Sequence, residues 1–310
     1  MPAAAASLYA APKYAAILIN AGDGEVLYAR QADAPRYPAS ITKVLTLYIA
    51  FEAIARGTLT PDTPIFISKF AAAQHPSKLG LKPGSQIRVS DAINVIATRS
   101  ANDIAVALAE HISGSEAAFA ERMTATAKRL GMASSTFVNA TGLPAARQLT
   151  TARDIATLSR AVVRDYPKFY KVFSQVAVEY EGQEITNHNH LLSTLPGVDG
   201  IKTGFTNAAG FTLAASAAHD GVRLIAVVLG GPSRMARDNN VTQLLDSGFD
   251  VLTQRSRGQA VTVATRLEEP DDLSDGVLQA LVETGTADDS QLALLKPPPA
   301  AVRPVARRGW

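Results

Sequence analysis

The spacing of hydrophobic residues changes twice along this chain, from a strand pattern to a helix pattern and back. These two changes limit the folds that the chain can adopt. Two short apolar runs near the start, residues 14–20 and 25–30, flank Ala21-Gly22-Asp23-Gly24 and predict a β-hairpin. From Gly197 onward a strand period returns in three runs, 198–206, 211–217 and 222–230, which predict consecutive antiparallel strands. Strands at both ends with helices between them predict an α+β fold, in which helices cover one antiparallel sheet.

Helical patterns fill the middle of the chain. After Pro38, an amphipathic helix buried on one side is predicted to begin at or near Ser40. Its apolar side consists of Ile41, Val44, Leu45, Tyr48 and Ile49, which follow the i, i+3, i+4, i+7 and i+8 spacing. Further helices are predicted over 91–98, 102–112, 116–130 and 152–163, and a last one has an apolar side from Val241 to Leu252. Beyond residue 254 the sequence turns acidic and then Ala- and Pro-rich, which indicates a tail or linker with one short helix at 276–283.

The composition excludes several function classes. The 30 Lys and Arg residues nearly balance the 28 Asp and Glu residues, so no strong positive field would recruit nucleic acid or an acidic membrane. The absence of cysteine excludes disulfides, thiolate nucleophiles and sulfur-ligated metals. No apolar stretch approaches the roughly 18 residues of a spanning helix, and the Ala-rich start resembles what remains around a signal-cleavage site. We therefore expect an exported protein with no integral membrane segment in this chain.

The most informative short motif is Ser40-Ile41-Thr42-Lys43. Residues three apart at a helix start lie on nearly one face, about 4.5 Å apart along the axis, so the Ser40 hydroxyl and the Lys43 amine could form a hydrogen bond. A serine needs a base to take its proton as it attacks a carbonyl, and a lysine can do so only when neutral. Burial and a second nearby cation both favour the neutral amine. By itself the motif fits a capping serine and a solvated lysine better than a catalytic pair.

Two further motifs are weak when taken alone. Ser100-Ala101-Asn102 precedes a predicted helix, where Ser100 or Asn102 could simply be the N-cap. In a catalytic interpretation, the serine moves a proton and the Asn102 amide binds the substrate backbone. Lys202-Thr203-Gly204 lies inside a predicted strand, where a glycine lets a ligand backbone approach and pair. All three motifs occur in the order and on the elements typical of penicillin-binding proteins and serine β-lactamases.

The chain resembles the serine-type D-alanyl-D-alanine carboxypeptidases, which are the low-molecular-mass penicillin-binding proteins of the peptidase S11 family. Longer strings carry the resemblance: PASITKVLT at 38–46, RSANDIAVALAE at 99–110, FVNATGL at 137–143 and VDGIKTGFTNAAGF at 198–211. It implies an antiparallel five-stranded sheet flanked by helices, as in β-lactamases and transpeptidases, with a helical subdomain. The domains implied are an N-terminal extension (1–13), the carboxypeptidase catalytic domain (14–252) and a tail or linker (253–310).

The resemblance also implies a reaction. An acyl-enzyme would form on Ser40 from a peptidoglycan stem peptide ending in D-Ala-D-Ala, with release of the last D-Ala, and β-lactams would acylate the same serine. Lys43 is then the acylation base. Ser100 and Asn102 form the second wall of the site, and Lys202 is the cation that keeps Lys43 neutral. No metal or other cofactor is implied, and the expected location is periplasmic or otherwise extracytoplasmic.

Substrate-binding residues follow from the same comparison. The Phe205 N–H, next to Gly204, is the second oxyanion donor after the Ser40 N–H. Thr203 and an arginine ahead of the last helix hold the terminal carboxylate, and we prefer Arg237 to Arg234 for this role. Family members often carry a β-rich domain and an amphipathic anchor after the catalytic domain, and the region after 254 matches neither. The ending VRPVARRGW resembles a linker to a peptidoglycan-binding SPOR domain, which would place further sequence after it.

Four other functions stay open. A D,D-endopeptidase or a serine β-lactamase would use the same motifs, although we find no Glu-x-x-x-Asn segment suitably placed between Asn102 and Lys202 for the usual lactamase. An inactive peptidoglycan-binding protein of the same fold would be expected to lose some of the polar groups that are all present here. A metal hydrolase would need more ligands than His188 and His190, which strand alternation would place on one face.

Overall fold

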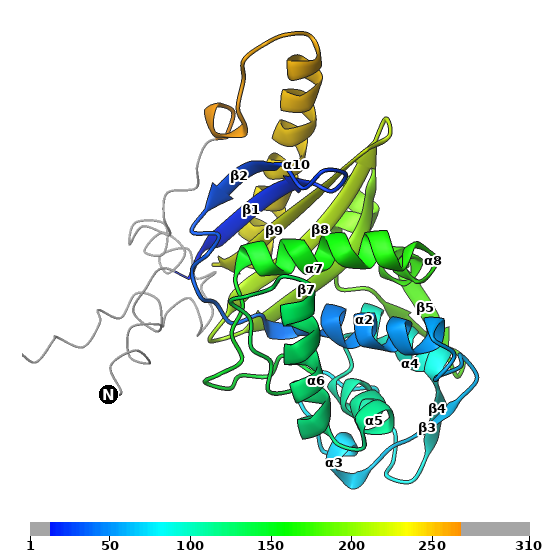
Figure 1. The fold of residues 1–310 in the computed structure, drawn as a ribbon. Helices are drawn as coiled ribbons and strands as arrows, with labels where there is room; N and C mark the ends of the chain where they lie inside the picture. The colour runs from blue at the N-terminus through cyan, green and yellow to red at the C-terminus, as the bar shows by residue number, and fades with distance from the viewer. Residues whose placement is uncertain (1–12, 268–310) are drawn as a thin grey trace, which may run out of the picture.

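A computed structural model describes residues 13–267, and a five-stranded antiparallel sheet forms its centre (Figure 1). The strand order is β2-β1-β9-β8-β7, with β1 Ala15–Asn20, β2 Val26–Arg30, β7 Val198–Thr206, β8 Gly210–His219 and β9 Val222–Gly231. Two small hairpins lie outside it: β3 (Pro64–Phe66) with β4 (Gln86–Arg88), and β5 (Ala177–Tyr180) with β6 (Gln183–Thr186). The predicted α+β fold, its N-terminal hairpin and its three late strands are confirmed.

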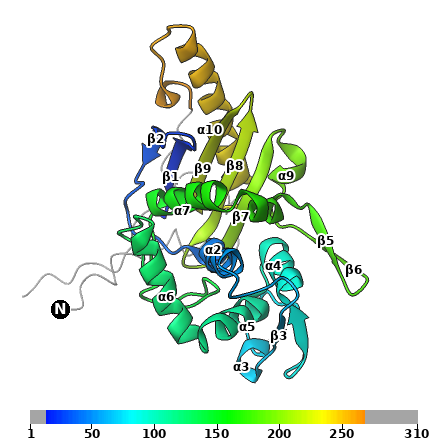
Figure 2. The same cartoon turned by 45° about the vertical axis from the view of Figure 1, so that its right-hand side comes forward.

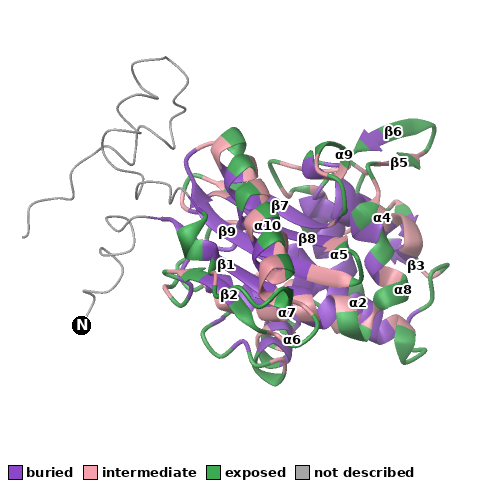
Figure 3. Ribbon diagram, turned by 90° about the horizontal axis from the view of Figure 1, so that it is seen from above, coloured by how far each residue is buried: buried purple, intermediate pink, exposed green. Residues whose placement is uncertain are grey.

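Alternation along the strands divides the core into two clusters. In β1, the side chains of Ala15, Ile17 and Ile19 pack in one cluster, and those of Ala16 and Leu18 pack in the other. Successive side chains of a strand point to opposite faces, so both faces of this sheet are buried. Figure 3 shows the central strands coloured almost entirely as buried. Burial on both faces explains why β7, β8 and β9 are such continuous apolar runs in the sequence.

Helices cover both faces of the sheet. One face packs against α2 (Thr42–Ala55) and α7 (Ala152–Asp165), and the other packs against α10 (Arg234–Ser256). A helical subdomain of α4 (Val89–Thr98), α5 (Asn102–Ser113) and α6 (Glu116–Arg129) lies on the far side of α2 (Figure 2). The shorter helices are η1 Ala39–Ile41, α3 Lys69–Ala72, α8 Pro167–Tyr170, η2 Lys171–Ser174, α9 Leu191–Thr194 and η3 Val263–Thr265.

Helix α2 is buried more completely than its sequence indicated. We expected an amphipathic helix buried on one side, but every residue from Thr42 to Ala53 is buried. The physical reason is that α2 lies between the sheet with α7 and the helical subdomain, so even its polar residues face protein. Lys43, in the first turn of this helix, consequently has no exposed surface.

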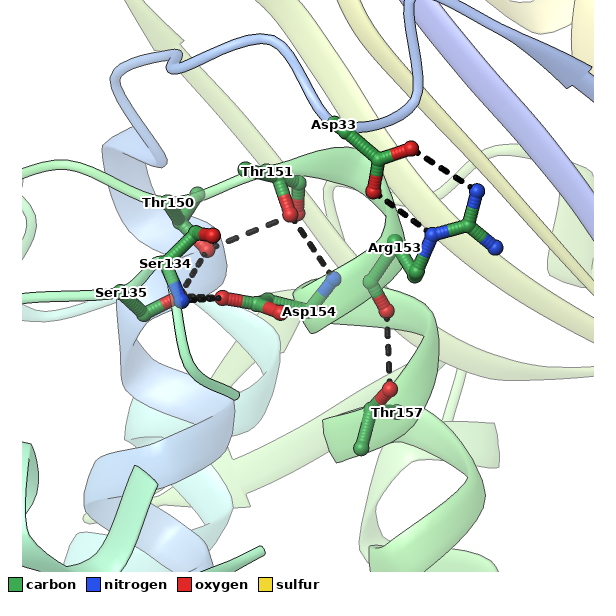
Figure 4. A network of polar contacts seen from close by, with 8 residues as sticks. All are labelled: Asp33, Ser134, Ser135, Thr150, Thr151, Arg153, Asp154 and Thr157. Atoms are coloured by element: carbon green, nitrogen blue, oxygen red, sulfur yellow. Dashed lines mark hydrogen bonds and ion pairs between the residues drawn. The ribbon is translucent and has the colours of Figure 1, made fainter. Parts of the chain in front are cut away.

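A polar network holds the N-terminus of α7 (Figure 4). The Thr151 hydroxyl accepts a 3.1 Å hydrogen bond from the Asp154 N–H, which caps the helix. The Asp154 carboxylate accepts a 2.7 Å hydrogen bond from the Ser135 hydroxyl, and Arg153 forms a 2.6 Å ion pair with Asp33. These contacts attach both ends of the segment between α6 and α7, and that segment also reaches the candidate site described below.

The described part of the chain extends past residue 252, where we expected the catalytic domain to end. Helix α10 continues to Ser256, and η3 then folds back so that Val263 and Leu267 are buried in the cluster beneath α10. The predicted boundary rested on the last apolar residues of α10, Val251 and Leu252, whereas the helix itself continues through one further polar turn. Residues 1–12 and 268–310, including the helix expected at 276–283, lie outside the described residues. Within 13–267, no helix combines the length and apolar character needed to cross a membrane.

Candidate active site

Ser40 lies in the short turn η1, which leads directly into α2. Its side chain borders a cavity of about 430 Å³. The Lys43 amine lies 3.2 Å from the Ser40 hydroxyl oxygen, in the first turn of the helix. The helix start expected near Ser40 is present, and the three-residue spacing brings the hydroxyl and the amine within hydrogen-bond distance.

Two further groups bind the Lys43 amine. It donates to the Asn102 side-chain oxygen at 2.7 Å and to the Thr141 carbonyl at 2.6 Å. The Asn102 amide nitrogen donates to the His75 carbonyl at 3.1 Å, so the amide oxygen must face the lysine. A neutral amine has two N–H bonds and one lone pair. With both N–H bonds donated to these oxygens, the lone pair is left for the Ser40 hydroxyl proton.

The surroundings of Lys43 favour this neutral state. Burial lowers its pKa well below the ordinary value for lysine, and the positive charge of Lys202 lowers it further, while Asp103 and Glu116 oppose the shift. Lys202, on β7, is also buried, and burial together with the charge of Arg237 lowers its pKa to about 7. The site therefore contains two buried lysines, and burial is the main cause that lowers the pKa of each.

Ser100 and Asn102 line the same cavity as Ser40. Ser100 is 4% exposed and has φ +64°, a left-handed conformation that is uncommon for serine. Its hydroxyl has no hydrogen-bond partner among the described residues. The N-cap of α5 is Ala101, and no side chain caps that end, so neither polar residue serves as the cap that the alternative interpretation required.

The edge strand β7 forms the third side. A Cβ atom at Gly204 would lie 2.8 Å from the Ser40 nitrogen, so only a glycine lets the strand pass this close to the turn that contains Ser40. Thr203 borders the cavity and is 7% exposed. Phe205 is 41% exposed and packs on Phe211, with ring centroids 4.3 Å apart.

Arg237 reaches the cavity from the start of α10. It is 3% exposed and donates to the Thr212 carbonyl at 3.0 Å and to the Asp238 carboxylate at 2.9 Å. Arg234 also borders the cavity but is exposed. Seven of the nine residues expected in the site therefore line one cavity, Ser40, Ser100, Asn102, Thr203, Gly204, Phe205 and Arg237, while Lys43 and Lys202 lie buried behind its wall.

Sequence reasoning missed the segment that packs against the turn containing Ser40. Thr141 contributes only its carbonyl, and the adjacent Gly142, at φ +86°, packs so closely on the Ala39 carbonyl that a Cβ atom would overlap it. Gln148 is 1% exposed; its oxygen accepts from the Val138 N–H at 2.7 Å and its nitrogen donates to Thr42 at 3.1 Å. In the sequence, only the string FVNATGL at 137–143 pointed to this segment. It was part of the family resemblance and assigned no role to any residue.

The two histidines considered as metal ligands occupy a turn between β6 and α9, where we expected a strand. Both His188 and His190 border the cavity. Among residues 13–267, no group of three or more His, Cys, Asp or Glu side chains is placed to hold a metal ion.

Comparison with known proteins identifies the family. The profile of Peptidase S11, D-alanyl-D-alanine carboxypeptidase, matches residues 3–233. The chain belongs to the peptidase S11 family. D-alanyl-D-alanine carboxypeptidase DacF of Bacillus subtilis is 35% identical over 238 residues, which are 76% of this chain and 61% of that protein. DacC of Escherichia coli is 37% identical over 240 residues, 75% of this chain and 60% of that protein. The match thus spans about three fifths of the length of these curated relatives.

Solved structures of S11 relatives share the fold. Penicillin binding protein 5 from Haemophilus influenzae superposes with a TM-score of 0.74 at 34% identity, covering 76% of this chain and 70% of that one. Penicillin-binding protein D2 from Listeria monocytogenes, solved in its ampicillin-bound form, gives a TM-score of 0.68 at 31% identity, covering 76% of this chain and 96% of that one. The five-stranded sheet with its helical subdomain is therefore the arrangement of this family.

Proposed function

We propose that the chain is a serine D-alanyl-D-alanine carboxypeptidase that removes the terminal D-Ala from peptidoglycan stem peptides and is acylated by β-lactams. The observation that carries the proposal is the geometry of Lys43, whose amine lies within hydrogen-bond distance of the Ser40, Asn102 and Thr141 oxygens. In the neutral amine, the two N–H bonds go to Asn102 and Thr141 and the lone pair is left for the Ser40 proton. This arrangement prepares a neutral base for the nucleophile. The names of the relatives point to the same activity.

Acylation begins when the Ser40 oxygen attacks the carbonyl carbon of the penultimate D-Ala and its proton passes to Lys43. The resulting oxyanion is stabilised by the backbone N–H groups of Ser40 and Phe205, which the close approach of Gly204 to the Ser40 nitrogen brings together. Lys202, charged and buried behind the wall, stabilises the developing negative charge and keeps Lys43 from binding a proton beforehand.

The intermediate then breaks the C–N bond to the last residue. The leaving nitrogen needs a proton, and the Ser100 hydroxyl, buried and without a hydrogen-bond partner, is free to pass one from Lys43. Thr203 and Arg237 bind the terminal carboxylate, while the Asn102 amide orients the peptide. Water finally attacks the Ser40 ester, releasing the shortened peptide and restoring the hydroxyl.

Two other activities use the same groups. A D,D-endopeptidase would cleave a crosslinked peptide, and a serine β-lactamase would hydrolyse the penicilloyl ester within seconds, whereas a carboxypeptidase would hold it for minutes. Mass spectrometry after incubation of the protein with a defined muropeptide, and separately with penicillin, distinguishes these outcomes. Loss of one D-alanine supports the proposal, crosslink cleavage favours the endopeptidase, and rapid turnover of penicillin favours the lactamase. An unchanged mass with no penicillin adduct would leave only a peptidoglycan-binding role.

The substrate implies the location. Peptidoglycan is assembled outside the cytoplasmic membrane, so we propose a periplasmic or otherwise extracytoplasmic protein. Fractionation of cells that produce the protein from its natural gene would test this, and recovery in the cytosol would contradict it.

A further inference from the structure

Two histidines at the cavity have no part in the mechanism above. His188 and His190 lie in the turn of residues 187–190, called here the histidine turn, and both side chains are exposed at the cavity rim. The turn is well anchored: the Asn187 oxygen accepts from the Asn189 N–H at 2.9 Å, and the Asn189 amide donates to the Gly200 carbonyl at 3.3 Å. These contacts hold both imidazoles at the start of β7.

The position on β7 determines which part of a substrate the histidine turn faces. Ser40 meets β7 at Gly204, and the oxyanion donor, the Phe205 N–H, follows it. The proposed carboxylate contact, Thr203, comes before it, so the leaving residue of a bound peptide extends from Gly204 toward the start of β7. The histidine turn, attached at Gly200, therefore borders the leaving-residue end of the cavity.

Charge at this end is entirely positive. Among the described residues that line the cavity, none is an Asp or a Glu, whereas Arg234 and Arg237 both contribute guanidinium groups. The charged and titratable groups that act on His188 are Lys202 from β7, Arg234 from α10, Arg99 at the end of α4 and His190. Arg237 is paired with Asp238, but Arg234 makes no ion pair within the part of the chain that the structure describes. When the terminal carboxylate of a bound peptide pairs with Arg237, Arg234 still has no counter-ion.

We propose that His188 and Arg234, with His190, form a subsite for a second anionic group on the leaving residue, so that a D-amino acid with a carboxylate side chain is accepted as the leaving group. The subsite rests on the proposed carboxypeptidase function and adds a specificity to it. Histidine and arginine both donate to a carboxylate, and partial exclusion of water at the cavity wall strengthens such hydrogen bonds.

Two matched substrates test the subsite. Diacetyl-L-Lys-D-Ala-D-Glu and diacetyl-L-Lys-D-Ala-D-Gln differ by one charge at nearly equal size, and diacetyl-L-Lys-D-Ala-D-Ala reports the basal reaction. We expect kcat/KM to be about tenfold higher for the D-Glu peptide than for the D-Gln peptide, as expected for a charge-assisted hydrogen bond. Both His188→Gln and Arg234→Gln should reduce that ratio to about twofold or less, while kcat/KM for D-Ala release stays within about twofold.

The pH dependence adds a readout that a purely structural role would not change. Desolvation at the cavity wall and the cations around it lower the pKa of His188 to about 4. A bound carboxylate favours the charged imidazole and raises that pKa. The D-Glu to D-Gln ratio should therefore rise as the pH falls from about 7.5 to about 5.5, where a glutamate side chain is still largely ionised. Titration of Lys43 affects both substrates equally and cancels in the ratio. Lys202 also acts on His188, so the pH dependence that remains in His188→Gln measures the contribution of Lys202.

The possible results are distinct. A ratio of one or less in the unaltered protein would overturn the subsite, as would a high ratio that His188→Gln and Arg234→Gln leave unchanged. A ratio independent of pH would remove His188 from the subsite and leave Arg234 alone. Failure to hydrolyse the D-Ala peptide would refute the carboxypeptidase function itself, and the subsite with it.

Discussion

The Lys43 amine lies 3.2 Å from the Ser40 hydroxyl oxygen while its two other partners come from 59 and 98 residues further along the chain. A helix start alone would place the two side chains near each other but would leave the lysine charged and mobile. The Asn102 oxygen and the Thr141 carbonyl orient the amine, and burial removes the water that would stabilise its charge. The reactivity of Ser40 thus depends on parts of the fold that its own helix does not contain.

Replacing the nucleophile should abolish acylation without affecting the fold. Ser40→Ala removes one oxygen from a partly exposed side chain, so the free energy of unfolding should stay within about 1 kcal/mol of the unaltered protein. Labelling with a fluorescent penicillin, followed on a denaturing gel, should disappear. Labelling that persists in the variant would place the nucleophile elsewhere.

The rate of acylation should follow a bell-shaped pH profile. Lys43 must be neutral, so the rate falls as the pH decreases through its lowered pKa and the amine binds a proton. Lys202 must stay charged, so the rate also falls as the pH rises through the region near 7, where burial places its pKa. Because the two lysines interact, the two apparent pKa values of this profile belong to the pair rather than to either lysine alone.

The coupling can be tested by removing one charge. In Lys202→Gln the positive neighbour of Lys43 is gone, so the pKa of Lys43 should rise and the acid limb should move to higher pH. The second-order rate of acylation by a fluorescent penicillin, measured across the pH range in both proteins, checks this. An acid limb that stays in place would show that Lys202 does not set the protonation of Lys43.

Gly142 offers a test of the segment behind the nucleophile turn. Alanine at Gly142 and at Gly84 would meet the same backbone strain, since both glycines have φ +86°, but only at Gly142 would the new methyl group overlap the Ala39 carbonyl. We expect Gly142→Ala to lower the free energy of unfolding by about 2 kcal/mol more than Gly84→Ala, because overpacking forces the backbone to shift. Acylation of Ser40 should slow about a hundredfold in Gly142→Ala alone. Equal effects in denaturant titrations and acylation assays would contradict the proposed support.

Gln148 should stabilise both the fold and the site. Gln148→Leu leaves the Val138 N–H without its acceptor and removes the hydrogen bond to Thr42, next to Lys43. A buried donor left unpaired costs about 1–3 kcal/mol, which chemical denaturation would measure. The control Gln183→Leu, at an exposed position on β6, should change the free energy of unfolding by less than about 0.5 kcal/mol. A comparably small effect at Gln148 would show that the segment is held by other contacts.

Local patterns in the sequence were sufficient to predict the strands of the central sheet and the long helices in their order, but not the small hairpins β3–β4 and β5–β6. The hairpin at residues 14–30, the helix start at Ser40 and the three late strands all follow from spacing within a few residues, because side-chain direction in a strand or helix depends on short-range geometry. The three motifs could be located for the same reason. What local spacing could not predict was the complete burial of α2, since a helix enclosed on all sides requires a second layer from distant parts of the chain.

The sequence by itself therefore determined which residues could perform chemistry and on which elements they would lie. Only the tertiary structure decided that Lys43 is desolvated, that the Thr141 carbonyl is one of its two acceptors, and that the histidine turn borders the cavity. The reason is physical: a backbone carbonyl is present in every residue, and a side chain is buried or exposed according to what packs against it. Neither the choice of carbonyl acceptor nor the burial of a side chain can be deduced from the type of residue at that position.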